Sequence, residues 1–126
     1  MWTDSWVGLP YEEIGRGPEA FDCLGLFIAL HRARQGRELA DPMISMTQAA
    51  RTRFVDSQRP LWRAVDAVQS EGDALLFRVR GLALHVGYAI SATQMLHVED
   101  AALSVIEDFT TMKWCSRLEG IYTYAG

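Results

Sequence analysis

The sequence predicts an α+β fold in which N-terminal helices pack on an antiparallel β-sheet of about five strands. Residues 21–30 form an apolar run with no charge after Asp22, which indicates a buried helix. From residue 71 onward, short segments of strand-like composition alternate with turn residues. Helical segments followed by a run of strands are typical of an α+β domain, and we expect residues 1–126 to form a single domain.

Helical segments are expected only before residue 60, apart from one short helix near the end. Residues 2–8 fit one or two short helical turns. The buried helix is expected from about Asp22 to Gln35, because Gly36 is a typical stop signal. A further helical segment opens at residues 41–42 and ends near residues 57–60, while residues 62–68 fit a short amphipathic turn or an extended arm. In the segment that opens at residues 41–42, the apolar side chains at helical spacing are Met43, Met46, Ala50 and Phe54.

The second half of the chain predicts an antiparallel meander. A tight hairpin at residues 91–93 joins two of the strands, and residues 112–117 fit a short helix. The five expected strands are residues 74–80, 84–90, 94–98, 102–106 and 118–124.

Composition excludes several classes of function. An apolar content of 49% with 22% charged residues rules out a disordered chain. The net charge of −4 gives no electrostatic reason to expect nucleic acid or an anionic membrane as a partner. No run approaches the ~18 apolar residues of a membrane span, and the first residues lack the pattern of a signal peptide. We therefore expect cytoplasmic synthesis, with neither nucleic acid nor membrane as a partner.

Two cysteines are present, and they do not make a disulfide framework, although one bridge between Cys23 and Cys115 stays open. Cys23 falls in the first turn of the buried helix, directly after Asp22 in N-cap position. Backbone N–H groups and the dipole at a helix N-terminus stabilise a thiolate, the nucleophilic form of cysteine. The alternative is that Cys23 is one more small buried apolar residue. Cys115 has no basic neighbour in sequence and is expected to be structural.

A pair of histidines gives Cys23 a possible chemical partner. His85 and His97 are twelve residues apart with the hairpin near the midpoint, and this even separation lets both side chains share one face of the sheet. Two adjacent imidazoles are costly to bury because each ring needs hydrogen-bond partners. Either histidine alone would be read as a satisfied core residue, but with Cys23 the pair suggests a nucleophile, a base and an orienting residue. We expect His31 to lie at the surface or to interact with the helix C-terminus, and Arg16 to be a solvated charge.

Three separated stretches resemble the signature of NlpC-type cell-wall cysteine peptidases. The first stretch is Tyr11-Glu12-Glu13-Ile14-Gly15-Arg16-Gly17-Pro18-Glu19-Ala20-Phe21-Asp22-Cys23-Leu24-Gly25-Leu26. As in that family, a tyrosine lies twelve residues before the cysteine. Residues 72–77, 85–88 and 96–97 resemble the family's Gly-Asp strand, its His-Val-Gly-Ile-Tyr strand and its second-histidine strand. The sequence departs from the family pattern at Glu13 and Ile14, which stand where an aromatic residue and a first glycine are usual.

The resemblance implies a small papain-like fold with the nucleophile helix packed on an antiparallel sheet. It implies a cysteine peptidase that cleaves peptidoglycan stem peptides, usually between γ-D-glutamate and a diamino acid, without metal or cofactor. Cys23, His85 and His97 would be catalytic. Tyr11 and Asp22 would bind substrate, Asp22 as the partner of a substrate amine, although Asp22 also fits a plain N-cap and Tyr11 fits packing.

Residues 117–122 resemble members of the family carried by phages and gene-transfer particles. This implies action at the bacterial cell wall as part of a phage-like particle, with phage tail or particle proteins as partners. Two alternatives stay open. The chain could be a non-catalytic tail or particle assembly component that retains the fold, or a metal-binding domain that uses Cys23, His85 and His97.

Overall fold

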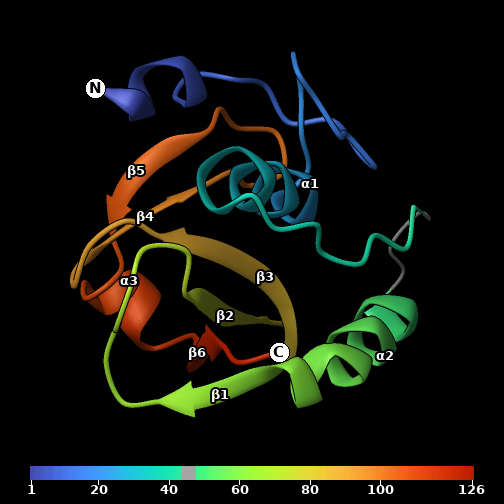
Figure 1. Ribbon diagram of the computed structural model, residues 1–126, viewed down its shortest axis with the longest axis vertical. Helices are drawn as coiled ribbons and strands as arrows, with labels where there is room; N and C mark the ends of the chain where they lie inside the picture. Colours follow the sequence, from blue (N-terminus) through green and yellow to red (C-terminus); the bar gives the residue numbers. More distant parts are fainter. Residues whose placement is uncertain (44–47) are drawn as a thin grey trace.

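The computed structural model describes residues 1–43 and 48–126, and it shows helices packed on a six-stranded antiparallel sheet (Figure 1). The strand order is β1-β6-β2-β3-β4-β5, and every pairing is antiparallel. This architecture confirms the predicted α+β class. The strands are β1 (Trp62–Val65), β2 (Ala74–Val79), β3 (Leu82–Ala89), β4 (Gln94–His97), β5 (Val105–Asp108) and β6 (Leu118–Tyr124).

The sixth strand is β1, which the sequence left as a turn or an extended arm. It pairs with β6 at one edge of the sheet, with Trp62 opposite Tyr124. Its residues are half-buried or exposed, so they do not show the strong alternation that marks a central strand. At the other edge β5 begins at Val105 rather than at residue 102, because Ser104 and the residue before it bond the N-terminal segment instead: the Ser104 N–H donates to the carbonyl of Leu9 at 2.8 Å.

Helix α1 (Cys23–Leu30) is the central element, and it crosses above the sheet in Figure 1. The Asp22 carboxylate caps its N-terminus by accepting a hydrogen bond from the Gly25 N–H at 2.7 Å. The helix continues as a wider π-helical turn (His31–Gln35) and stops at Gly36, whose φ of 63° lies in the left-handed region that favours glycine. The predicted start and stop of the buried helix are therefore confirmed.

Helix α2 (Gln48–Gln58) packs against β3. The prediction that this helix opens at residues 41–42 is wrong. The Asp41 carboxylate accepts the Met43 N–H at 3.0 Å, and Met43 has a φ of 48°, which is incompatible with a right-handed helix. Met46 lies outside the described residues. Two short 3₁₀ turns (Trp2–Trp6 and Arg59–Leu61) and helix α3 (Met112–Cys115) complete the helical elements described.

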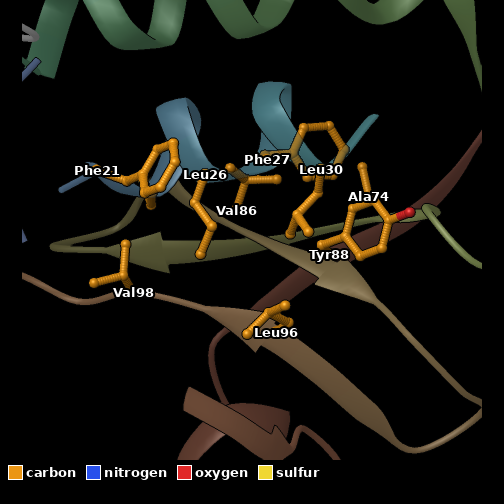
Figure 2. Close-up of a cluster of buried hydrophobic side chains, with 10 residues drawn as sticks. Phe21, Leu26, Phe27, Leu30, Ala74, Val86, Tyr88, Leu96 and Val98 are labelled. Atoms are coloured by element: carbon orange, nitrogen blue, oxygen red, sulfur yellow. The ribbon is translucent and has the colours of Figure 1, made fainter. Parts of the chain in front are cut away.

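Apolar side chains fill both sides of the sheet. Figure 2 shows the cluster between α1 and the sheet, where Leu26 and Phe27 of the helix meet Val86, Tyr88 and Leu96 of the strands. A second cluster lies on the opposite face under α3, and it includes Leu75, Phe77, Ala89, Met95, Phe109, Trp114 and Ile121. Each large side chain buried in this way contributes about 1.5–3 kcal/mol, so α1 is anchored firmly enough to hold its first turn in a fixed place. Across residues 1–43 and 48–126, no helix is both long enough and apolar enough to cross a membrane.

Candidate active site

Cys23 is the first residue of α1, and its side chain lines a pocket of about 90 Å³ together with His85. The walls of this pocket are largely apolar, formed by side chains such as Phe27 of α1, Phe54 of α2 and Trp62 of β1. Only 6% of Cys23 is exposed. The nucleophile that the sequence predicts is therefore held in a sheltered cleft between α1, α2 and the sheet.

Burial raises the pKa of the Cys23 thiol above its ordinary value. The positive charge of Arg51 and hydrogen bonds from the backbone N–H groups of Val86 and Leu24 act in the opposite direction, without outweighing burial. The sequence analysis expects the helix N-terminus to stabilise a thiolate, but at this sulfur the loss of surrounding water is the larger effect. A base is needed to take the proton when the thiol reacts.

A continuous hydrogen-bonded chain runs from His85 on β3 through His97 on β4 to Glu107 on β5. His85 Nε2 lies 2.8 Å from His97 Nδ1, and His97 Nε2 lies 2.9 Å from Glu107 Oε1. The other oxygen of Glu107 accepts the indole N–H of Trp114 at 2.9 Å. The predicted pairing of His85 and His97 on one face is confirmed by these contacts. Glu107 and Trp114 are additional members that the sequence reasoning missed.

This chain defines the tautomers of both imidazoles. An ionised carboxylate only accepts hydrogen bonds, so the Nε2–H of His97 donates to Glu107, and Nδ1 of His97 is left as an acceptor. His85 must therefore donate its Nε2–H to that acceptor. The lone pair of His85 is then on Nδ1, and His85 lines the pocket together with Cys23.

Electrostatics keep these groups neutral at rest, apart from the carboxylate. Burial, together with the neighbouring His97 and Arg51, lowers the pKa of His85 to about 3. Burial likewise lowers the pKa of His97, against the opposite effect of Glu107. For Glu107, burial favours the neutral acid, but hydrogen bonds from Trp114 and His97 outweigh it and lower the pKa of the carboxyl. The resting site is thus a thiol, two neutral imidazoles and one carboxylate.

The strands place the two histidines by their register. Tyr88 pairs with Leu96 and Ala89 with Met95, so residues 85 and 97 point to the same face one step apart diagonally. A β-bulge between β2 and β3 lies just before His85, where Phe77 pairs with His85 but Arg78 pairs with Ala83. Bulges of this kind re-aim side chains next to active sites, and here the bulge directs His85 toward the pocket that it shares with Cys23.

Tyr11 and Asp22, the predicted substrate-binding residues, flank Cys23 in different ways. Tyr11 is half-buried, and burial together with the negative charge that Cys23 can carry raises the pKa of its hydroxyl. Asp22 is only 2% exposed, and its Oδ1 accepts hydrogen bonds from Gly25 N–H and from Arg16 Nη1 at 2.8 Å. Asp22 therefore acts as an N-cap that is already ion-paired.

Three other expectations from the sequence are wrong. Arg16 is not a solvated charge, because it bridges Asp22 and Asp41 with only 16% of its side chain exposed. Of the two places expected for His31, the surface is wrong because the side chain is fully buried, and the residue lies at the C-cap of α1. Cys115, expected to be structural, is exposed, and it does not form a disulfide with Cys23. Polar or apolar neighbours in sequence do not reveal these placements, since each depends on a segment distant in the chain.

The alternative of a metal centre lacks a ligand set. In the described part of the chain, no three histidine, cysteine or acidic side chains are grouped so as to hold a metal ion. Both ring nitrogens of His97 are engaged with His85 and Glu107, so this imidazole has no lone pair left to offer.

A buried thiol at a helix start, beside an imidazole from an antiparallel sheet, is the arrangement that thiol-based acyl transfer requires. Residues 8–122 match the model of the NlpC/P60 family. The chain therefore belongs to the NlpC/P60 family, and its helices and sheet have the fold of that family.

Solved structures agree with this fold. An NLP/P60 family protein from Staphylococcus aureus, described as similar to a lipoprotein, is 19% identical with a TM-score of 0.68 and covers 96% of this chain. The NlpC/p60 domain of the peptidoglycan hydrolase SagA is 18% identical with a TM-score of 0.64 and covers 94%. NlpC1 from Trichomonas vaginalis is 23% identical with a TM-score of 0.63 and covers 96%.

The chain spans 38% of the staphylococcal protein, 42% of NlpC1 and 89% of the SagA domain. Comparison with curated proteins gives no match.

Proposed function

We propose that this protein is a cysteine endopeptidase that hydrolyses peptidoglycan, cleaving stem-peptide amide bonds between γ-D-glutamate and a diamino acid. The observation that carries the proposal is the pocket that Cys23 shares with His85, whose Nδ1 is left as an acceptor by the chain to His97 and Glu107. Membership of the NlpC/P60 family supports it, as does the similar fold of the SagA domain, which belongs to a peptidoglycan hydrolase.

In this mechanism the thiol proton of Cys23 passes to Nδ1 of His85 while the sulfur attacks the amide carbonyl. The backbone N–H of Cys23, at the start of α1, is the natural donor to the developing oxyanion. The His85 imidazolium then protonates the leaving amine as the C–N bond breaks. Water attacks the thioester with His85 as base, which releases the acyl group and restores the thiol. His97 holds the ring of His85 throughout.

Substrate binding is assigned in this proposal to Tyr11 and Asp22. Tyr11 has a hydroxyl that can bond the peptide. A substrate amine that binds Asp22 has to compete with Arg16, which bonds the same oxygen at 2.8 Å. The apolar walls around Phe54 and Trp62 suit the aliphatic parts of the stem peptide.

The proposal extends to the setting in which the enzyme acts. The resemblance of residues 117–122 to phage and gene-transfer-particle members supports cytoplasmic synthesis followed by action at the cell wall within such a particle. Tail or particle proteins are the partners that this setting provides. Co-purification of the protein with intact particles would test it.

The decisive experiment is digestion of purified peptidoglycan under reducing conditions by the wild type, Cys23→Ala and Cys115→Ser, with products identified by mass. We expect new amine termini from the wild type and from Cys115→Ser, the matched cysteine control, and none from Cys23→Ala. A wild type that releases no amine termini would contradict the hydrolase and favour a non-catalytic assembly component that retains the fold.

A further inference from the structure

We propose that Glu107 is a positioning residue for the Cys23–His85 pair, acting through His97 to fix which nitrogen of His85 is basic and to balance the charge that His85 gains in the reaction. The proposal rests on the proposed catalytic roles of Cys23 and His85. To Cys23, His85 and His97 it adds Glu107 of β5, and it assigns Trp114 of α3 the role of holding Glu107 in place.

The first reason is directional. The hydrogen bonds from His85 to His97 and from His97 to Glu107 are 2.8 and 2.9 Å long. Two linked imidazoles could donate in either direction, and only a partner at the end of the chain decides between them. Glu107 is that partner. Without its acceptor, His97 could donate from Nδ1 instead, and His85 would then turn its N–H toward the thiol.

The second reason is charge. When His85 takes the proton of Cys23 it becomes a cation in a place where Arg51, Arg117 and Lys113 already oppose positive charge. Two acidic groups, Glu107 and Glu99, raise the pKa of the neighbouring His97. Glu107 is hydrogen-bonded to the ring, whereas Glu99 is paired with Lys113 at 3.6 Å. Glu107 is therefore the carboxylate that stabilises the His85 imidazolium through His97, to which it is hydrogen-bonded.

The third reason is that Glu107 is itself held in place. Trp114 is 1% exposed, and its indole N–H donates to Oε2 of Glu107 at 2.9 Å. The same indole stacks on His85 with 5.5 Å between ring centroids and meets His97 edge-on at 4.9 Å. One rigid side chain thus packs against both imidazoles and orients the carboxylate, as expected for a preorganised support of a catalytic base.

The test compares Glu107→Gln and Glu107→Leu with Glu99→Gln, each in a Cys115→Ser background so that Cys23 is the only thiol. Iodoacetamide alkylates Cys23 by forming an S–C bond with loss of iodide, and the rate is measured from pH 5 to about 9, across the ordinary range of histidine and cysteine pKa values. We expect Glu107→Gln to slow alkylation about 10-fold at neutral pH and to move the profile to higher pH, and Glu107→Leu to slow it about 100-fold. Glu99→Gln removes a carboxylate that does not bond the ring, and we expect a change below about twofold.

Nitrogen NMR of the histidine rings provides the second measurement. We expect protons on Nε2 of both His85 and His97 in the wild type, the same pattern in Glu107→Gln, whose amide oxygen still accepts, and a mixed pattern in Glu107→Leu. Equal alkylation profiles for Glu107→Gln and Glu99→Gln, or a wild-type proton on Nδ1 of His85, would overturn the proposal. Neither result depends on peptidoglycan, so failure of the proposed substrate and failure of the relay are distinguishable.

Discussion

His31 and His85 are both buried, and burial lowers the pKa of each, to about 4 for His31 and about 3 for His85. They differ in what their nitrogens bind. His31 donates Nε2–H to the carbonyl of Gly72 at 2.8 Å, and its Nδ1 accepts from Arg37 at 3.2 Å. His85 donates Nε2–H to His97, and its Nδ1 is left as the acceptor at the pocket that holds Cys23. A lowered pKa therefore does not distinguish a candidate base from a structural histidine, whereas a place in the wall of the pocket that holds Cys23 does.

The largest expected effect is on turnover. Replacing His85 with Gln keeps a donor toward His97 but removes the base, so we expect kcat for peptide hydrolysis to fall about 10³-fold. His31→Gln should leave kcat nearly unchanged, since His31 packs against Phe27 and Trp62 of the pocket wall but does not itself line the pocket. The measurement is the hydrolysis rate of the two variants under the same conditions. An equal loss of kcat in both would contradict the different roles assigned to His85 and His31.

For stability we expect the opposite order: replacing His31 should lower the free energy of unfolding more than replacing His85. His31→Leu leaves the buried carbonyl of Gly72 and the guanidinium of Arg37 without their ring partner, so we expect the free energy of unfolding to fall by about 2–3 kcal/mol. Urea denaturation measures this change. His85→Gln serves as the control because its amide can still bond His97. A His31→Leu variant as stable as the wild type would contradict the structural role.

The buried histidines around His31 and around His85 should both make the protein less stable at acidic pH. Each buried histidine has a folded pKa below the unfolded value of about 6.5, so the unfolded state binds more protons as the pH falls below that value. The free energy of unfolding should therefore decrease from pH 6.5 toward pH 4, by about 1.4 kcal/mol per pH unit for each histidine that stays neutral. Denaturation at several pH values measures how steeply the free energy of unfolding depends on pH. In His31→Gln this dependence should be weaker by the contribution of one histidine. A stability that does not change over this range would show that the histidines are not buried as described.

The smallest expected effect concerns strain near the active site. Ile14 has a φ of 58°, although β-branched residues disfavour the left-handed region. Replacing Ile14 with Gly should relieve this strain and, after the entropic cost of glycine, raise the free energy of unfolding by roughly 0.5–1 kcal/mol. Thermal or urea unfolding checks it, with Glu13→Gly as the neighbouring control. A loss of stability would show that packing of the Ile14 side chain outweighs its backbone strain.

Local patterns in the sequence predicted much of the fold. The apolar run placed α1 with its N-cap Asp22 and its stop at Gly36, and the even spacing of two histidines placed them on one face. The turn at Ile14 is a different case. There the family resemblance marks a glycine position, and the backbone keeps the left-handed conformation even though isoleucine occupies it.

What the sequence missed depends on contacts between distant segments. Glu107 lies one residue beyond the strand expected at residues 102–106, so its place beside His97 needed the correct bounds of β5. His31 lies in a stretch rich in arginine, and only the π-helical turn and the carbonyl of Gly72 explain why it is buried. The raised pKa of Cys23 depends on the elements packed over it, which a helix N-terminus considered alone does not include.

The central claim is that the nitrogen His85 presents to the pocket activates Cys23. The most direct test is the rate at which iodoacetamide alkylates Cys23 at neutral pH in the Cys115→Ser protein, compared with the same protein carrying His85→Gln or His31→Gln. The account predicts that His85→Gln slows alkylation by about 10²-fold, while His31→Gln leaves the rate unchanged. Equal rates in all three proteins would contradict it.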